Sequence, residues 1–157
     1  MASASALASE DARAAAAVGD AAAWADLPGW AALLQRHAHL FEPWIEGGAV
    51  GLVARAAADA GRGRMLVWTR VQGAMQVQWR DYRGFADCGV AVLFVAQPGA
   101  LAAVHARLHD NALGQMKLQL RQGGLFIYVL APKSQLLDEG YEDFLESLGL
   151  AFMGACR

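Results

Sequence analysis

The histidines form two pairs whose spacing could serve a bound ion or a cofactor. His37 and His39 make an H-x-H segment, and His105 and His109 lie four residues apart. Residues four apart share one face of a helix, so the second pair could hold a metal ion, but no Asp, Glu or Cys has a spacing that predicts a third ligand. We therefore expect no metal site and retain His37 and His39 as candidate ligand-binding residues.

The cysteines and the known catalytic motifs give little support for an enzyme. Cys88 and Cys156 lie far apart, with no C-x-x-C, and Cys88 has no base near it in the sequence. A buried, inert thiol in a reducing, cytoplasmic compartment is the simplest interpretation. The sequence also lacks a P-loop, a G-x-G-x-x-G, a G-x-S-x-G and an H-E-x-x-H motif. We expect a binding protein without catalytic residues of its own.

Aromatic and basic residues gather in one expected hairpin, where they could hold a flat, anionic ligand. Trp68 and Trp79 fall on its two strands and offer large aromatic surfaces. Arg70 and Arg80 could pair with carboxylates through two-pronged bonds, and Gln78 lies beside Trp79. These five residues join the two histidines as candidate cofactor-binding residues. The alternative for each is ordinary packing or a solvated strand face.

Composition and charge agree with a small-ligand protein. The chain has 157 residues, 56% of them hydrophobic, and no apolar run long enough to span a bilayer. Net charge is −2, but residues 63–123 hold seven Lys or Arg against three Asp or Glu. Such a local excess can steer an anionic small molecule, and it falls far short of what a duplex-binding protein shows. We expect no nucleic acid as a partner and no membrane span.

The elements that must position these residues follow from apolar periodicity and turn residues. Residues 1–23 form an Ala-rich helix or frayed tail, and residues 24–157 a single domain. Apolar residues recur about every 3.6 residues in the expected helices and every second residue in the expected strands. The helices cover residues 24–37, 48–60, 98–111 and 141–148, and the strands cover residues 65–70, 74–79, 88–96, 116–121 and 125–131. Tight turns pair strands antiparallel, so we expect an α+β fold with a large antiparallel sheet and helices mainly on one face.

The strand block resembles the intracellular haem-utilisation proteins of the HemS/ChuS and HutX/ChuX kind. The matching segments are Ala57-Ala58-Asp59-Ala60-Gly61, Met65-Leu66-Val67-Trp68-Thr69-Arg70, Ala74-Met75-Gln76-Val77, Lys117-Leu118-Gln119-Leu120 and Gly123-Gly124. The resemblance implies a HemS/ChuX-like fold and a haem or tetrapyrrole carrier in iron utilisation. If the protein were an enzyme, the reaction implied would be haem degradation.

A second hypothesis keeps the fold without haem. In an alignment with that family, the ligand histidines fall on Ala31 and Trp68. The alternative function is therefore a non-catalytic, dimeric interaction module, or a module for another small ligand, that has lost the ligand histidine.

Assembly as a homodimer is expected under both hypotheses. Short members of the family resemble one half of a fused pair, and residues 125–130 are apolar on both faces of the expected strand. Helices of the same chain can cover one face, and a second copy could cover the other.

Overall fold

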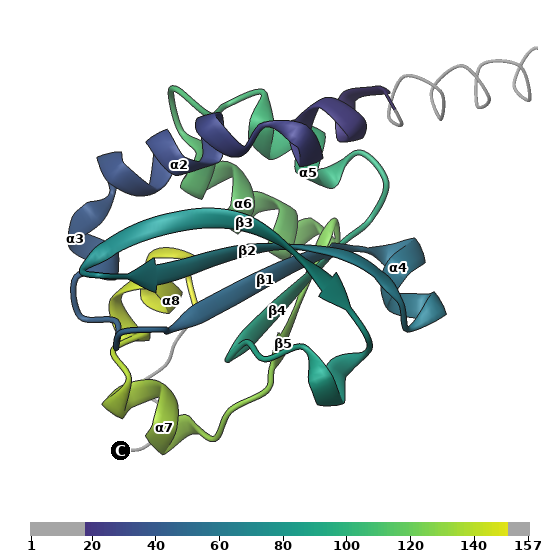
Figure 1. Ribbon diagram of the computed structural model, residues 1–157. Helices are drawn as coiled ribbons and strands as arrows, with labels where there is room; N and C mark the ends of the chain where they lie inside the picture. Colours follow the sequence, from purple (N-terminus) through teal and green to yellow (C-terminus); the bar gives the residue numbers. More distant parts are fainter. Residues whose placement is uncertain (1–17, 151–157) are drawn as a thin grey trace, which may run out of the picture.

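The computed structural model describes residues 18–150, which form a five-stranded sheet flanked by helices (Figure 1). The strands are β1 (Ala49–Ala54), β2 (Gly63–Val71), β3 (Ala74–Tyr82), β4 (Val92–Ala96) and β5 (Leu125–Val129). They lie in the order β3-β2-β1-β4-β5. β1 and β4 run parallel, and the other neighbours run antiparallel. The α+β class is thus confirmed.

The sheet is mixed, so the expectation of an antiparallel sheet was wrong in that respect. A tight turn makes two strands antiparallel only where strands that follow each other in the sequence are also neighbours in the sheet. After β3 the chain leaves the edge of the sheet, passes through the 3-10 turn η1 (Phe85–Asp87) and enters β4 on the far side of β1. That longer connection brings β4 beside β1 in the same direction.

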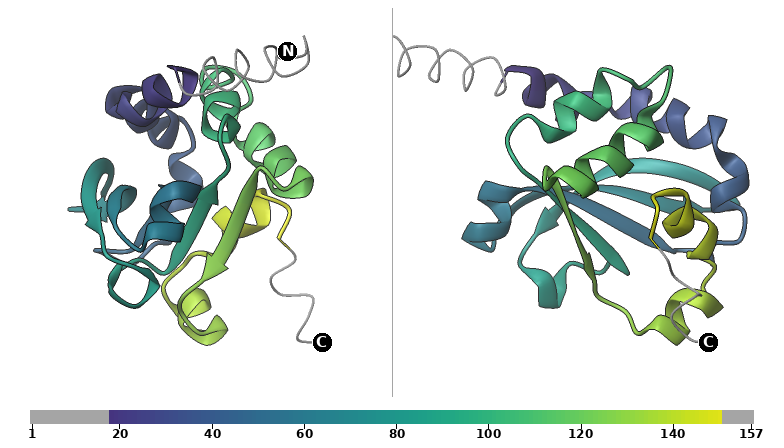
Figure 2. Two further views of the ribbon diagram at one scale, coloured as in Figure 1. Left: turned by 90° about the vertical axis from the view of Figure 1, so that its right-hand side faces the viewer. Right: turned by 180° about the vertical axis from the view of Figure 1, so that it is seen from behind.

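Helices cover the two faces of the sheet unequally (Figure 2). The helical segments are residues 18–25, α2 (Leu27–Arg36), α3 (Ala38–Phe41), α4 (Arg55–Ala60), α5 (Ala100–His105), α6 (Ala112–Gln122), α7 (Lys133–Asp138) and α8 (Glu142–Ser147). The main helical layer contains α2, α5, α6 and α8, and we call the face beneath it the helix face. The opposite, second face is partly covered by α4 and the loop with η1. Within residues 18–150, no helix has the length and apolar character needed to cross a membrane.

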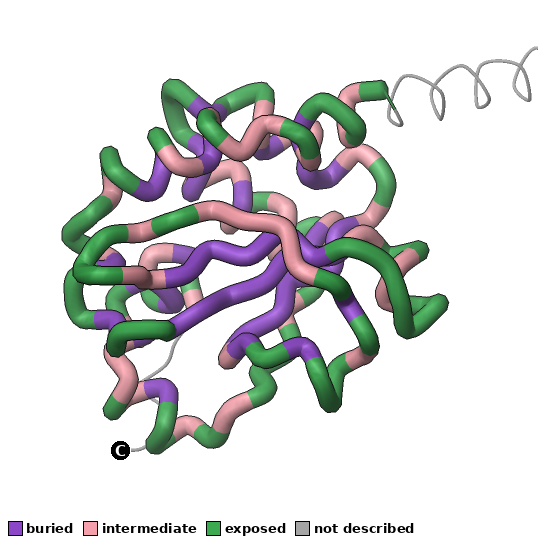
Figure 3. Tube along the Cα trace, viewed as in Figure 1, coloured by how far each residue is buried: buried purple, intermediate pink, exposed green. Residues whose placement is uncertain are grey.

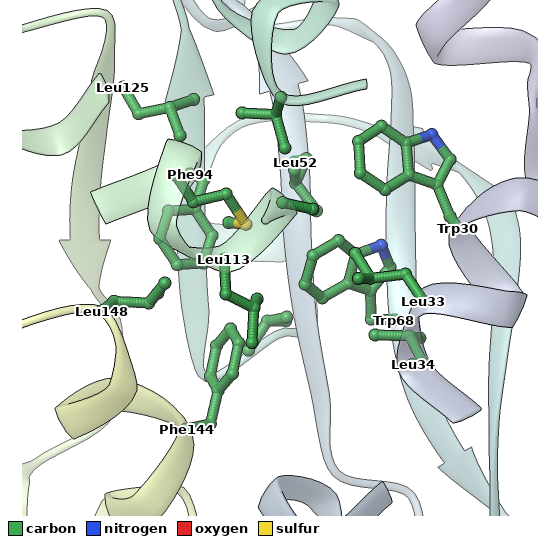
Figure 4. Close-up of a cluster of buried hydrophobic side chains, with 14 of the residues drawn as sticks. Trp30, Leu33, Leu34, Leu52, Trp68, Phe94, Leu113, Leu125, Phe144 and Leu148 are labelled. Carbon is green, nitrogen blue, oxygen red and sulfur yellow. The ribbon is translucent and has the colours of Figure 1, made fainter. Parts of the chain in front are cut away.

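The larger core lies between the helix face and its helices (Figure 4). Trp30 of α2 packs on Trp68 of β2, with ring centroids 6.0 Å apart, and Phe144 of α8 meets Trp68 at 6.1 Å. All three side chains are buried. β1, β4 and residues 65–69 of β2 are buried almost throughout, because a second cluster, in which Met65 and Val67 of β2 join Cys88, lies on the other side of the sheet (Figure 3). Cys88 is buried, as expected.

Two segments have the opposite secondary structure to the one that their patterns predict. Residues 116–121 belong to α6 rather than to a strand, and residues 49–54 form β1 rather than the start of a helix. In α6 the buried residues are Ala112, Leu113 and Met116, which lie three and four apart, while Leu118 is 40% exposed. In β1 both faces are buried, so the period-two signal vanishes and a continuous apolar run remains.

The expected hairpin of β2 and β3 is confirmed, together with its turn. Gln72 and Gly73 both have positive φ, of 53° and 76°, as the tight primed turns of hairpins require. The carboxylate of Glu46 accepts hydrogen bonds from the backbone N–H groups of both turn residues. The hairpin tip is therefore tied to the segment that leads into β1.

Candidate ligand cleft beside the β2–β3 hairpin

Two tryptophans, Trp24 and Trp79, form an aromatic pair on the helix face of the hairpin. Leu66 and Trp79 are cross-strand partners, so Trp79 lies on the helix face of the edge strand β3. The helix of residues 18–25 crosses above and places the ring of Trp24 6.3 Å from that of Trp79, at an interplanar angle of 36°. Both rings are half-buried at the margin of the core, so part of each remains open to a ligand.

Arg64 supplies a cation beside this pair. Its guanidinium carbon lies 4.6 Å from the centroid of the Trp79 ring. Arg64 is exposed and pairs with no carboxylate among residues 18–150. Nearby carboxylates have partners of their own: Asp59 binds Arg55 at 2.9 Å, and Asp81 lies 3.8 Å from Arg83. A guanidinium that stacks on an aromatic ring keeps its N–H edge free for an anion.

These side chains enclose a cleft of about 300 Å³. It is lined by Trp24, Ala54, Ala56, Ala57, Arg64 and Trp79. The alanines come from the end of β1 and the start of α4, and their small side chains leave the space open. Apart from Arg64 the lining is aromatic or aliphatic, so the cleft combines an apolar wall with one cation at its border.

Of the residues expected in the site, only Trp79 reaches this cleft. Trp68 is fully buried in the core, and its Nε1 has no hydrogen-bond partner within the described part of the chain. It packs instead of offering a surface to a ligand. Gln78 and Arg80 point to the second face, opposite Val67 and Met65. There the Gln78 amide is oriented so that its oxygen accepts hydrogen bonds from the Arg80 guanidinium at 2.9 Å.

The remaining expected residues lie near the other end of the hairpin. His37 and His39, at the junction of α2 and α3, have ring centroids 6.2 Å apart. Desolvation, with the neighbouring Arg36 as a second cause, lowers the pKa of His37. Arg70 donates to the backbone oxygen of Phe41 at 2.9 Å, which fixes α3 to β2. The structure therefore divides the seven expected residues among separate places.

The other histidine pair has a structural contact. His105 Nε2 lies 2.8 Å from a carboxylate oxygen of Asp26, and His109 is exposed. Asp26 is also the N-cap of α2, accepting from the backbone N–H of Gly29 at 3.0 Å. These two hydrogen bonds, that to His105 foremost, lower the pKa of Asp26. The contact joins the start of α2 to α5.

Sequence reasoning missed five of the six residues that line the cleft. Trp24 was assigned to packing within a helical stripe, and Arg64 stood one residue before the expected strand. The three alanines carry no signal for binding at all. The available signal was that Arg64 and Trp79, near the open end of the hairpin, come close once β2 and β3 are paired from the Gln72-Gly73 turn.

Comparison with known proteins gives one structural match. No protein-family model and no curated protein matches the chain. The chain is similar to the solution structure of TT1886 from Thermus thermophilus, a conserved hypothetical protein suggested to be a sterol carrier protein. The two are 17% identical over 80% of this chain and 84% of that chain, with a TM-score of 0.41.

The resemblance to haem-utilisation proteins was wrong. The structural match is to TT1886 and not to a haem-utilisation protein. The resemblance also used residues 117–120 as a strand within an antiparallel sheet, whereas these residues lie in α6 and the sheet is mixed. The function as a haem carrier rested on this resemblance and is corrected with it.

Proposed function

We propose that the protein is a non-catalytic binding module for a small, mainly apolar molecule with an anionic group, held in the cleft of Trp24, Trp79 and Arg64. The observation that carries the proposal is the juxtaposition of two half-buried indole rings with an arginine that has no carboxylate partner within residues 18–150.

The apolar body of the ligand would lie against the indoles. Trp24 and Trp79 offer flat surfaces, while Ala54, Ala56 and Ala57 form a shallow aliphatic wall. Each Å² of apolar surface removed from water contributes about 25 cal/mol, so a ligand that covers both rings gains more than one that touches either alone. At about 300 Å³ the cleft is at the small end of ligand pockets. This size favours a compact ring system or a short acyl chain.

The anionic group would meet Arg64. A carboxylate, sulfonate or phosphate could accept two parallel N–H bonds from its guanidinium. Because Arg64 is exposed, this contact contributes direction and selectivity more than affinity. An uncharged analogue should therefore bind in the same place, but more weakly.

A fluorescence titration tests the proposal with two probes, anilinonaphthalene sulfonate and its uncharged anilinonaphthalene parent. We expect the anionic probe to bind about three- to fivefold more tightly, a difference of about 0.6–1 kcal/mol. Arg64→Gln should remove that preference. Arg62→Gln is the matched control, because Arg62 is also exposed but does not line the cleft.

A second pair of variants tests the place of binding. Ala56→Leu in α4 fills the cleft, whereas Ala60→Leu makes the same change in the same helix outside it. Loss of probe binding in the first variant alone supports the cleft. Equal binding by both variants, or an unchanged preference in Arg64→Gln, overturns the proposal.

We also propose that the module assembles as a homodimer, in line with the expectation from residues 125–130. What supports it is the exposure of apolar side chains on both faces of β5: Phe126 and Tyr128 on the second face are 38% and 39% exposed, and Val129 on the helix face is 53% exposed. Light scattering across a hundredfold dilution tests the assembly. A mass of two chains is expected, and a constant mass near one chain of 16.7 kDa overturns it.

A further inference from the structure

We infer that the proposed homodimer forms edge to edge, with β5 of one protomer paired antiparallel to β5 of its partner about a two-fold axis at Ile127. This inference rests on the proposed assembly and adds the surface and its register. β5 is the last strand of the sheet, next to β4 only (Figure 2). Leu125–Val129 contains no charged residue and no Pro, the features that usually protect an edge from pairing.

The direction of the backbone groups sets the register. Leu130 N donates to Ala91 O at 2.9 Å, and Gln97 N donates to Gly124 O at 2.8 Å, so the even-numbered residues direct their bonds toward β4. Bonding direction alternates along an antiparallel strand. The N–H and C=O groups of Leu125, Ile127 and Val129 therefore face outward, away from the sheet.

A two-fold axis at Ile127 uses all of these groups. Ile127 then exchanges both of its backbone bonds with the partner's Ile127, and Leu125 does the same with the partner's Val129. Between them, Phe126 stands opposite the partner's Tyr128 in a pair without backbone hydrogen bonds, where side chains approach closely. The two sheets would join into a continuous one.

Side chains on the second face complement one another across this axis. The ring of Phe85 lies 4.9 Å from that of Tyr128, and the guanidinium carbon of Arg55 lies 6.0 Å from the ring centroid of Phe126. The two exposed rings of β5 on this face are thus each in contact with a neighbour: Phe126 with Arg55, and Tyr128 with Phe85. The two-fold axis places the Arg55–Phe126 contact of one protomer beside the Phe85–Tyr128 contact of the other.

This self-complementarity favours a second copy as the occupant. A two-fold interface must match a surface to itself, and β5 does so in hydrogen bonding and in aromatic pairing. An unrelated strand could use the backbone groups, but it would not need Phe126 and Tyr128 at positions symmetric about Ile127.

Light scattering of the full chain tests the register through three variants. Ile127→Pro removes an outward N–H, a position that edge strands tolerate, and leaves the bonds to β4 in place. Phe126→Glu puts an anion opposite the partner's Tyr128 and removes one ring from each cross-strand aromatic pair. Both variants should shift the mass from two chains to one. Phe126→Glu combined with Tyr128→Arg should restore the dimer, because the changed residues are cross-strand partners.

The outcomes separate this inference from the proposals on which it rests. A wild-type chain that remains a monomer overturns both the homodimer and the β5 interface. A dimer that persists in folded Ile127→Pro and Phe126→Glu keeps the homodimer and overturns β5 as its surface. Failure of the double variant to restore a dimer that Phe126→Glu has broken overturns the axis at Ile127. Should Ile127→Pro lose its near-ultraviolet circular dichroism, Phe126→Glu and the double variant decide.

Discussion

The two edges of the sheet are built in opposite ways. β3 turns Gln76, Gln78 and Arg80 to its second face and is covered on its helix face by α2 and Trp24. β5 has only apolar and aromatic side chains, and most of them are exposed. Polar residues and a helical cover protect an edge from pairing, while an open apolar edge invites it. The contrast divides the roles: the β3 side is suited to a small ligand, and the β5 side to another chain.

The largest effect we expect contrasts the cover of β3 with the open side of β5. Trp30→Ala should lower the free energy of unfolding by about 3–5 kcal/mol, because it removes a fully buried ring. It also removes the bond from Trp30 Nε1 to Ala23 O, of 2.7 Å. Phe126→Ala, measured at low protein concentration, should cost less than ~1 kcal/mol, as an exposed side chain does. Denaturant unfolding measures both, and equal losses would erase the distinction between the edges.

The same contrast explains what could be predicted from the sequence. The hairpin of β2 and β3 can be predicted from the sequence, because the alternation of apolar and polar residues and the Gln72-Gly73 turn are both local signals. Residues 116–121 alternate equally well, and their place in α6 depends on Ala112 and Leu113, which complete the helical stripe one turn earlier. β1 was missed because burial on both faces depends on α4 and the loop with η1, which tertiary packing supplies.

The cleft was harder to predict than the fold. Trp68 and Trp79 were both expected to contact a ligand, but Trp68 is fully buried in the core. Which of two tryptophans in one hairpin stays open depends on what covers each strand. β2 is interior and lies beneath Trp30 and Phe144, whereas β3 is an edge that only part of a helix shields.

The next largest effect concerns the tip of the hairpin that forms the β3 edge. Glu46→Ala should lower the free energy of unfolding by about 1–2 kcal/mol, because charge-assisted bonds to two turn N–H groups are lost. Glu42→Ala is the control, since that exposed side chain makes no hydrogen bond within the described residues. Thermal unfolding followed by circular dichroism compares the two. A loss no larger than that of the control would show that the tip does not depend on Glu46.

A pH-dependent effect should appear in the cover of β3 and not at β5. The hydrogen bond to His105 lowers the pKa of Asp26, so the stability that Asp26 contributes is present above its unfolded pKa of about 3.8 and is lost as pH falls through the lower, folded value. Asp26→Asn keeps an oxygen for the N-cap but has no charge. The variant should be less stable than the wild type at pH 5–7 and equal to it at pH ~2. A difference that persists undiminished in acid contradicts this origin.

The smallest effect on stability is expected from adding charge to each edge in turn. Val129→Lys places a cation on the open strand, where Val129 is 53% exposed, and Gln76→Lys does so on the exposed polar side of β3. Both changes should alter the free energy of unfolding by no more than about 0.5 kcal/mol, since neither removes a buried contact. Their effects on association should differ, because lysine blocks an edge only where that edge would otherwise pair. Association is measured by turbidity on heating and by the mass from light scattering across a dilution series at room temperature. Both the turbidity and the mass should fall for Val129→Lys and stay at the wild-type level for Gln76→Lys. If the β3 variant changes association as much as the β5 variant does, both edges are equally open and the assignment of separate roles to them fails.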